Sequence, residues 1–418
     1  MSTEQAIAMS SPVREANAAP AHGWGTGGLS GAAAALRRRY PTIDDLERAA
    51  GRRAPRFARD FVANGLGDDV CLRRNRAALD ACQIVPRYGL DVRQVDTGVS
   101  LFGQRYAMPL GVAPMGLAGL LRAGADEALA AAAQAARVPY VYSSVGNATI
   151  ERIGQLAPDV FWFQLYAVPA DDHRVSLDLA RRAARAGARV LVVTLDVPVR
   201  AKRSGDVRNG LVVPFKPRPR TVLDVLRAPR WALDLLRHGQ PRFGNFIPYA
   251  GEAPSTRQLA SYVFQQMAGP MTWDALVRIR DAWPHALVVK GVLHPDDAQT
   301  ALSIGADGVL VSNHGGRQFD AAPAALEALP AIVERVGQHA TVLVDGGLRH
   351  GVDVLRALRC GAHAALAGRA FLWGHGAAGP AGAAHVAALF QEEFRIALAQ
   401  AGVRTPEEAR AGGRAASS

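Results

Sequence analysis

The stretch GVLVSNHGGRQ, residues 308–318, joins a short apolar run to a polar turn that contains two adjacent glycines. An apolar run of this length, bounded by turn residues, is typical of a strand buried on both faces. The pattern recurs along the chain, with longer Ala- and Leu-rich helical segments between the runs. The eight expected strands are Leu110–Ala113, Tyr140–Ser143, Val160–Leu165, Val190–Thr194, Leu287–Val289, Gly308–Val311, Thr341–Val344 and Ala364–Ala367. Eight strands that alternate with helices predict an α/β fold, a closed (β/α)8 TIM barrel rather than an open sheet.

Small or polar residues follow every expected strand, among them Gln164, Thr194, Lys290 and Asp345. Barrel enzymes build their sites from the carboxyl ends of the strands, which meet at one mouth. The sequence therefore predicts a functional site at that mouth.

The spacing of the strands breaks once, after the fourth. Roughly ninety residues separate Thr194 from Leu287, far more than one crossover needs, which predicts an inserted segment at about residues 204–272. Within it, residues 214–242 combine many arginines with leucines at helical spacing. Two interpretations stay open: a basic amphipathic helix pair that lies on an anionic membrane, or a lid or subunit-contact helix with a solvated basic face.

Composition excludes several classes of protein. The chain has 418 residues, a formal charge of +11 and 6% aromatic residues, and it carries no nucleic-acid-binding motif, so we expect no nucleic-acid partner. Cys71, Cys82 and Cys360 lie far apart and lack metal-ligand spacing, which fits a reducing cytosol and predicts neither a disulfide framework nor a metal site. No stretch has the roughly 18 uninterrupted apolar residues of a membrane span.

Folding signals begin near Tyr40, and Thr42 is the expected N-cap of a helix. Residues 1–36 are rich in Ala, Gly and Ser and are expected to form a disordered leader. We therefore expect one barrel domain, residues 37–412, followed by a tail, residues 413–418.

His314 and Arg317 are the first candidates for chemistry. An arginine can hold a carboxylate with two hydrogen bonds while a nearby histidine takes a proton from the adjacent carbon or hydroxyl group. Asp196 follows the fourth strand. It either fixes the tautomer of a catalytic histidine or caps a turn before Pro198, and the residues alone leave this open.

Two loops carry a phosphate-binding pattern. Residues 345–349, DGGLR, follow the seventh strand, and Gly368-Arg369 follow the eighth. In barrels these loops commonly bind phosphate through backbone N–H groups and an arginine. No strand is followed by a dinucleotide-binding glycine motif. Lys290, after the fifth strand, has three open interpretations: a Schiff base, a stabiliser of negative charge on a cofactor, or a side chain that extends to solvent.

Taken together, these motifs resemble the FMN-dependent 2-hydroxy acid oxidase and dehydrogenase family, which includes glycolate oxidase, L-lactate dehydrogenase and mandelate dehydrogenase. The resemblance covers about residues 40–410. Its matching stretches are Ala113-Pro114, WFQLY at 162–166, TLDVP at 194–198, Val289-Lys290-Gly291, SNHGGRQ at 312–318 and Asp345-Gly346-Gly347.

This resemblance implies a role for each candidate residue. His314 would be the base that starts oxidation of an L-2-hydroxy acid to the 2-oxo acid, by carbanion formation or by hydride transfer, with Asp196 as its partner. Arg317 would be the main ligand of the substrate carboxylate and Arg203 a second contact. Tyr166 would hydrogen-bond the substrate oxygen.

The same resemblance implies FMN as the cofactor. Lys290 would stabilise negative charge on the reduced flavin rather than form a Schiff base. The residues expected to contact the flavin ring are Ala113, Pro114, Met115, Ser143, Gln164 and Thr194, and Ser312 is assigned to the cofactor as well. Those expected to hold the ribityl chain and phosphate are Asp345, Gly346, Gly347, Arg349, Gly368 and Arg369.

One position departs from the family pattern. Phe61 stands where the family has a tyrosine whose hydroxyl binds the substrate carboxylate, and the lost hydrogen bond costs about 1.5–3 kcal/mol. The alternative function is therefore a flavin-binding barrel with altered or lost 2-hydroxy acid activity. Gly116 and Val145, which would line the substrate pocket, are small and favour a substrate with a larger side chain.

Partners follow from the same resemblance. Family members that pass electrons to quinone carry a membrane-seeking segment after the fourth strand, where the insertion lies. This favours quinone over O2 as the acceptor, although both stay open. We expect a homo-oligomer, with a tetramer as the family's usual form. We also expect a cytoplasmic location, with peripheral attachment to the inner face of the membrane as one interpretation of the basic segment.

Overall fold

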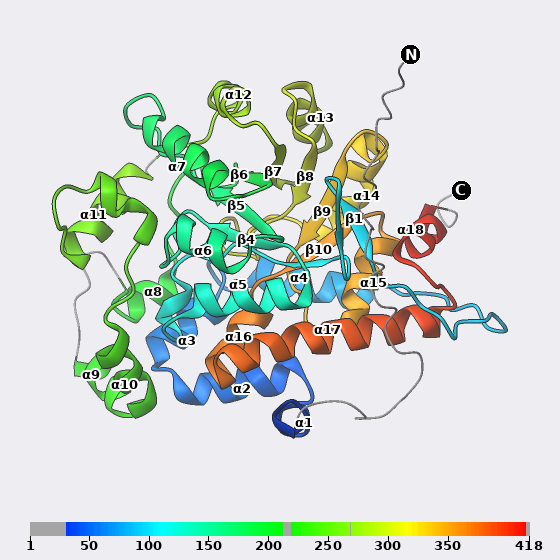
Figure 1. Ribbon diagram of the computed structural model, residues 1–418, viewed down its shortest axis with the longest axis horizontal. Helices are drawn as coiled ribbons and strands as arrows, with labels where there is room; N and C mark the ends of the chain where they lie inside the picture. The colour runs from blue at the N-terminus through cyan, green and yellow to red at the C-terminus, as the bar shows by residue number, and fades with distance from the viewer. Residues whose placement is uncertain (1–30, 212–218, 268, 415–418) are drawn as a thin grey trace, which may run out of the picture.

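At the centre of the computed structural model, which describes residues 31–211, 219–267 and 269–414, parallel strands form a closed barrel (Figure 1). Around the barrel the strand order is β10-β3-β4-β5-β6-β7-β8-β9. The strands are β3 Leu110–Val112, β4 Tyr140–Ser143, β5 Phe161–Leu165, β6 Val190–Thr194, β7 Ala286–Val292, β8 Gly308–Val311, β9 Thr341–Asp345 and β10 Ala364–Ala367. The predicted α/β barrel is confirmed, and each observed strand overlaps its expected range.

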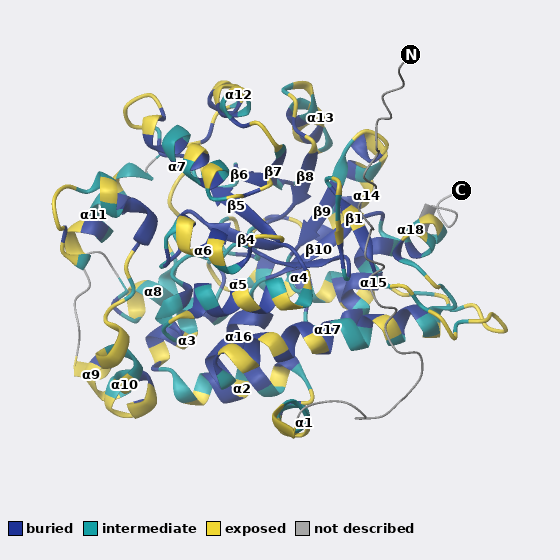
Figure 2. Cartoon of the chain, in the orientation of Figure 1, coloured by how far each residue is buried: buried dark blue, intermediate teal, exposed yellow. Residues whose placement is uncertain are grey.

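Helices wrap the strands, which Figure 2 shows to be buried along their length. The helices outside the insertion are α1 Gly31–Arg39, α2 Ile43–Arg53, α3 Arg56–Ala63, α4 Val70–Ala81, α5 Ala125–Ala136, α6 Ile150–Leu156, α7 Arg174–Arg185, α12 Trp273–Ala282, α13 Pro295–Ser303, α14 Ala325–Val336, α15 Gly351–Arg359, α16 Arg369–Ala378, α17 Pro380–Ala401 and α18 Pro406–Arg414, with one 3-10 turn, η1 Ala118–Leu120. The long helix α17 packs against α16, α5 and α15.

A hairpin of β1 Val99–Leu101 and β2 Gln104–Tyr106 packs against the amino end of the barrel. The ring of Phe102, in its turn, lies 5.5 Å from that of Trp162 near the start of β5. Trp162 also donates a hydrogen bond from Nε1 to the Tyr106 hydroxyl, 2.9 Å away. With this end covered, the carboxyl ends of the strands form the open mouth.

The predicted insertion lies between β6 and α12 and consists of short helices: α8 Ser204–Arg208, α9 Pro219–Leu226, α10 Pro229–His238, η2 Gly244–Tyr249 and α11 Thr256–Gln266. Residues 212–218 of the basic segment lie outside the described residues. Trp231 anchors the α9–α10 pair to the body of the protein. Its ring packs edge-on against Phe57 at 5.4 Å, and its Nε1 donates to the Leu120 carbonyl at 2.9 Å. The opposite faces of both helices are exposed.

Two domain boundaries need correction. Residues 31–36, predicted to belong to the disordered leader, form the start of α1, whose Arg37 pairs with Glu392 on α17. The boundary is therefore nearer residue 30, and residues 1–30 lie outside the described part of the chain. Similarly, α18 extends to Arg414, into the predicted tail. The expected N-cap is confirmed, because the Thr42 hydroxyl accepts the Asp45 N–H of α2.

All three cysteines are free thiols, although Cys82 and Cys360 bring their sulfur atoms to 3.8 Å across the α4–α15 contact. Among the described helices, none combines the length and the apolar character that crossing a bilayer requires.

Asp353 joins α4 to α15 beneath the loop that follows β9. Its fully buried carboxylate accepts from both terminal nitrogens of Arg76, at 2.7 and 2.8 Å, from Arg356 at 2.8 Å, and from the backbone N–H of Arg349. Arg76 also donates to the carbonyl of Gly347. Burial alone would raise the pKa of Asp353, but these donors hold the pKa below its usual value.

We expect Asp353→Asn to lower the free energy of unfolding by about 3–5 kcal/mol, because it leaves two partly buried guanidinium groups without their buried carboxylate. The control is Asp80→Asn, since Asp80 also pairs with Arg76 but its side chain is 61% exposed; a loss below about 1 kcal/mol is expected there. Denaturant unfolding measures both.

The depressed pKa gives the sign of the pH dependence. Asp353 stabilises the fold above the pKa of an unfolded aspartate, and this stabilisation is lost as pH falls through the lower folded pKa. The Asn variant should lack this part of the acid sensitivity. Equal losses of unfolding free energy in the two variants would contradict the conclusion that the buried Asp353 carboxylate joins α4 to α15.

Candidate active site

Three predicted residues form a hydrogen-bonded chain at the barrel mouth. The Tyr166 hydroxyl lies 3.1 Å from Nε2 of His314, and Nδ1 of the same ring lies 2.9 Å from the Asp196 carboxylate. Tyr166 follows β5, Asp196 follows β6 and His314 follows β8. The fold thus brings together residues as far as 148 positions apart.

The carboxylate determines which imidazole nitrogen carries the proton. Burial would raise the pKa of Asp196, but the charges of His314 and Lys290 lower the pKa below its usual value. An ionised carboxylate can only accept, so Nδ1 donates to it; when the imidazole is neutral, Nε2 is left as an acceptor for the Tyr166 hydroxyl. The alternative reading of Asp196, a turn cap only, does not account for this contact.

The backbone around His314 is left-handed over three successive residues. His314, Gly315 and Gly316 have φ of +58°, +64° and +75°. A side chain at Gly316 would meet the backbone nitrogen of Leu72 at 2.5 Å, so α4 lies directly against this turn. A non-glycine residue in this conformation is strained, and strain of this kind concentrates at functional sites.

Lys290 points into the barrel mouth. Its ammonium donates to the Ser312 hydroxyl at 2.8 Å and lies 3.5 Å from Asp345 and 3.9 Å from Asp196. Its side chain is only 4% exposed, which excludes the interpretation that it extends to solvent. Two carboxylates stabilise positive charge on the ammonium, which suits the stabilisation of an anion better than Schiff-base formation.

The Phe61 ring contacts both arginines that were predicted to meet the substrate. The guanidinium carbon of Arg203 lies 4.7 Å, and that of Arg317 5.2 Å, from the centre of the ring. Arg203 pairs with Asp206 at 2.8 Å. Arg317 donates to the Asn64 carbonyl at 2.7 Å and forms no ion pair with any residue that the structure describes. Its charge is therefore available to a carboxylate.

A second chain of polar groups crosses neighbouring strands. Ser143 donates to the Gln164 side-chain oxygen at 2.7 Å, and Gln164 donates to the Thr194 hydroxyl at 2.8 Å. All three side chains are buried. Ser312, directly after β8, makes a separate contact by donating to Asp345 at 2.6 Å.

The two arginines predicted to bind phosphate have different surroundings. Arg369 is partly buried and donates to the carbonyls of Val62 and Gly315, at 3.0 and 2.9 Å, and within the described ranges it has no ion-pair partner. Burial, and then the nearby charge of Arg349, lower the pKa of Arg369 to about 10. Arg349 itself pairs with two acids of α2, Asp44 at 2.8 Å and Glu47. The structure thus directs Arg349 toward α2 and leaves Arg369 as the unpaired cation.

Comparison with known proteins identifies the family. A family model described as FMN-dependent dehydrogenase matches residues 50–413. The chain belongs to the FMN-dependent dehydrogenase family. FMN is accordingly its cofactor, and 2-hydroxy acid dehydrogenases and oxidases are its relatives.

Individual relatives agree with this assignment. The chain is 40% identical to an L-lactate dehydrogenase of Caulobacter vibrioides over 361 residues, 86% of this chain and 94% of that protein. It is 36% identical to an (S)-mandelate dehydrogenase of Pseudomonas putida, over 86% of this chain and 90% of the relative. The crystal structure of a monotopic membrane protein, (S)-mandelate dehydrogenase, superposes with a TM-score of 0.83 at 35% identity, over 87% of this chain and 96% of the other.

The residues at the mouth fit FMN in this FMN-dependent dehydrogenase. The polar chain of Ser143, Gln164 and Thr194 offers donors and acceptors of the kind that a flavin ring requires. Arg369 is a partly buried cation without a carboxylate partner among the described residues, which suits a phosphate. Near these groups, the Oδ2 atom of Asp196 has no hydrogen-bond partner among the described residues and lies 3.9 Å from the Lys290 ammonium.

Several contributing groups were not predicted. The carbonyls of Val62 and Asn64 orient Arg317 and Arg369, and backbone acceptors leave no signal in a sequence. Asn75 of α4 is buried and exchanges hydrogen bonds with Asn313 at 2.8 and 2.9 Å. A polar residue on the buried face of a predicted helix was the available signal for Asn75.

Gly291 packs so closely against Asp196 that no side chain fits between them. At this glycine φ is +94°, and a Cβ would lie 2.5 Å from the Asp196 Cβ. We expect Gly291→Ala to displace Asp196, to reduce turnover, and to destabilise the fold by about 1–3 kcal/mol more than a control.

The matched control is Gly187→Ala, because Gly187 has φ of +93° and open space around its missing side chain. Both variants introduce the same backbone strain. The difference between their free energies of unfolding, measured by thermal unfolding, therefore reports the steric contact with Asp196. If the two variants behave alike, Asp196 is not confined by Gly291.

Proposed function

We propose that this chain oxidises an L-2-hydroxy acid to the 2-oxo acid, with His314 as the base and Arg317 as the main ligand of the substrate carboxylate. The observation that carries the proposal is the chain Tyr166–His314–Asp196, which lies at the same mouth as an arginine without an ion-pair partner. Arg203 provides a second positive charge beside the Phe61 ring.

Each residue has a defined task in this mechanism. Arg317 and Arg203 orient the carboxylate, and the Tyr166 hydroxyl hydrogen-bonds the substrate oxygen. Nε2 of His314 accepts the substrate proton, and Asp196 stabilises the imidazolium that results. Lys290 places positive charge at the rim between Asp196 and Asp345.

FMN, when bound, supplies the two-electron acceptor. The residues that would hold its ring are Ala113, Pro114, Met115, Ser143, Gln164, Thr194 and Ser312, and those for its ribityl phosphate are Asp345, Gly346, Gly347, Gly368 and Arg369. Arg349, which pairs with Asp44 and Glu47, would contribute its positive charge near the phosphate without contacting it directly.

Two small residues support a substrate larger than glycolate or lactate. Gly116 follows β3 and Val145 follows β4, and a side chain at 116 would meet Val145 at 2.6 Å. Val145 itself fills the space beside Gly116, so the support for a larger substrate is the small combined size of these two side chains. The name of one relative, (S)-mandelate dehydrogenase, is consistent with an aromatic 2-hydroxy acid.

We further propose peripheral attachment to the inner face of the membrane through α9 and α10, with quinone as the preferred acceptor over O2. The proposed assembled form is a homo-oligomer, for which a tetramer is the usual state in the family. The support is a row of exposed apolar residues on these helices, chiefly Leu226, 71% exposed, and Leu236, 82% exposed. A structural relative is itself described as a monotopic membrane protein.

The test is anaerobic visible spectroscopy of the purified holoprotein with L-lactate, glycolate, L-mandelate and a long-chain L-2-hydroxy acid in turn. Bleaching of the flavin bands by one acid supports the proposal, and readmitted air then separates O2 from other acceptors. If no acid bleaches the bands, the alternative holds, which is a flavin-binding barrel with altered or lost activity. Phe61, the position that departs from the family pattern, is the residue that suggests this alternative.

His314→Ala should keep the yellow flavin and slow its bleaching by about 10²–10⁴-fold, because the proton loses its acceptor. Stopped-flow absorbance measures the rate. His285→Ala, at an exposed position outside the mouth, is the control and should be unchanged. Undiminished bleaching in the His314 variant would refute the assigned base.

Phe61→Tyr should lower the KM for a small 2-hydroxy acid by about tenfold or more, since its hydroxyl would donate to a carboxylate held by Arg203 and Arg317. Steady-state kinetics with a dye acceptor measures the change. The control is Phe319→Tyr, an exposed phenylalanine. An unchanged KM would show that position 61 does not reach the substrate.

A further inference from the structure

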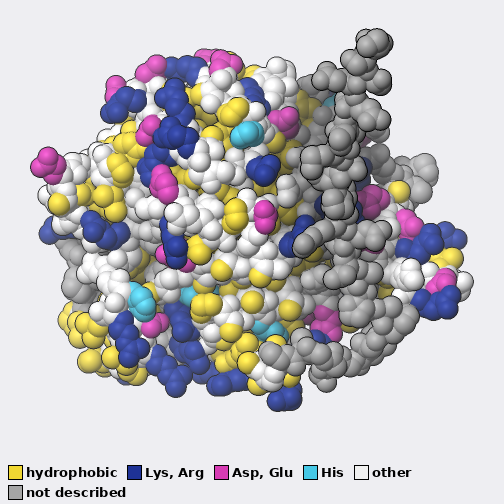
Figure 3. Space-filling model, viewed as in Figure 1, with side chains coloured by type: hydrophobic (Ala, Val, Ile, Leu, Met, Phe, Trp, Pro, Cys, Tyr) yellow, Lys and Arg dark blue, Asp and Glu magenta, His cyan; other side chains and the backbone are white. Residues whose placement is uncertain are grey.

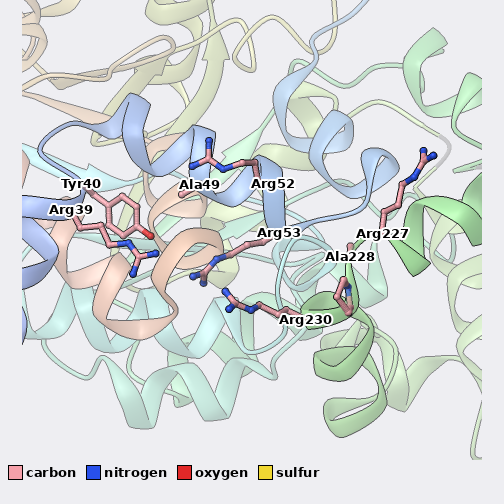
Figure 4. A pocket seen from close by; sticks show the side chains of 9 residues that line it. Arg39, Tyr40, Ala49, Arg52, Arg53, Arg227, Ala228 and Arg230 are labelled. Carbon is pink, nitrogen blue, oxygen red and sulfur yellow. The ribbon is translucent and has the colours of Figure 1, made fainter.

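A pocket of about 330 Å³ lies where the C-terminal ends of α1 and α2 meet the start of α10 (Figure 4). Its lining includes five arginines, Arg39, Arg52, Arg53, Arg227 and Arg230, together with Tyr40. We call it the arginine pocket. None of these residues belongs to the candidate active site.

Three of the arginines converge. Figure 4 shows Arg39, Arg53 and Arg230 extending toward one another, whereas Arg52 and Arg227 point outward at the rim. Arg53 is half-buried. Burial and the charges of Arg230, Arg122 and Arg39 lower the pKa of Arg53. Like charges held this close repel one another and attract an anion.

The chain supplies no anion that the structure records. Within residues 31–211, 219–267 and 269–414, none of the five arginines is in an ion pair, while the neighbouring Asp234 is engaged by Arg122 at 3.5 Å. Helix dipoles explain only part of the cluster. Arg39, Arg52 and Arg53 suit the C-terminal ends of their helices, but Arg230 lies in the first turn of α10, where negative charge is favoured. That turn has no acidic residue and no side-chain cap.

We propose that the arginine pocket binds a phosphate group, presented by the headgroup of an anionic membrane lipid. Guanidinium groups bind phosphate oxygens with paired hydrogen bonds. The volume is at the lower end for small-molecule sites, which suits one headgroup.

The apolar residues beside the pocket favour a lipid as the source of the phosphate. Val222, Leu223, Leu226, Leu233 and Leu236 of α9 and α10 are exposed. Figure 3 shows Lys and Arg side chains gathered along the edge that α2, α9 and α10 occupy in Figure 1, with hydrophobic side chains at its left end. Leucines beside a basic pocket match the acyl and headgroup layers of a membrane surface. In this respect the inference rests on the membrane contact of the proposed function.

The experiment compares two double variants of the full-length holoprotein. Arg53→Gln with Arg230→Gln removes two of the three converging charges of the arginine pocket. Arg220→Gln with Arg237→Gln removes the same charge from exposed positions of α9 and α10 outside the pocket. Co-sedimentation with phosphatidylcholine vesicles, with and without phosphatidylglycerol, measures binding.

The pocket pair should weaken binding to the phosphatidylglycerol vesicles at least about tenfold more than the control pair. Equal losses would overturn the proposal, because net charge alone would then account for binding. Both variants should retain FMN absorbance and oxidise the 2-hydroxy acid with a soluble dye, which shows that they are folded.

A calorimetric titration with sn-glycerol 3-phosphate separates the two sources of phosphate. If the pocket pair loses this binding but keeps vesicle binding, the lipid source is overturned and the pocket belongs to a soluble phosphate ester. If neither the phosphate ester nor the vesicles depend on the pocket, the phosphate site is overturned as well.

The proposed function fails separately. A wild-type protein that no 2-hydroxy acid bleaches would refute the oxidation chemistry without altering the vesicle result. Leu226→Ser with Leu236→Ser should lose binding to both vesicle types, and unchanged binding would refute the membrane contact of α9 and α10 while the soluble phosphate ester still tests the pocket.

Discussion

Closure of the parallel barrel is the constraint on which the rest of the structure depends. Once β10 pairs with β3, the register makes Ser143 a direct neighbour of Gln164 and Thr194 a direct neighbour of Lys290. The chain of Ser143, Gln164 and Thr194 thus follows from strand pairing. The loops after the strands bring His314 and Asp196 to the same mouth. Because Ser143, Gln164 and Thr194 are buried and hydrogen-bonded in series, a shift of one strand would leave some of these groups without partners.

Much of this arrangement could be predicted from the sequence because barrel strands are short, apolar and followed by turn residues. All eight runs were located to within a few residues. Residues 312–318 identified the site because they match a motif of the family, and the structure adds that His314, Gly315 and Gly316 have left-handed backbone. The ends of the domain were less predictable. Nothing local distinguishes the Ala-rich start of α1 from a disordered leader, because the contact that holds it, Arg37 with Glu392, spans the chain.

Other features depend on contacts that no local pattern encodes. Arg349 follows the predicted phosphate loop, yet its guanidinium turns to Asp44 and Glu47, some three hundred positions earlier. Phe61 was recognised as a missing hydroxyl, but its position against both Arg203 and Arg317 required the structure. A single ring therefore contacts two guanidinium groups that come from different parts of the chain.

The Trp231 anchor of α9 and α10 has an evolutionary consequence. These helices are held to the body by Phe57, by the Leu120 carbonyl and by the pair between Arg122 and Asp234, none of which lies at the barrel mouth. Selection can consequently alter the outward residues of the α9–α10 appendage without altering the residues at the barrel mouth. The barrel and its appendage form two modules that can diversify at different speeds within one polypeptide.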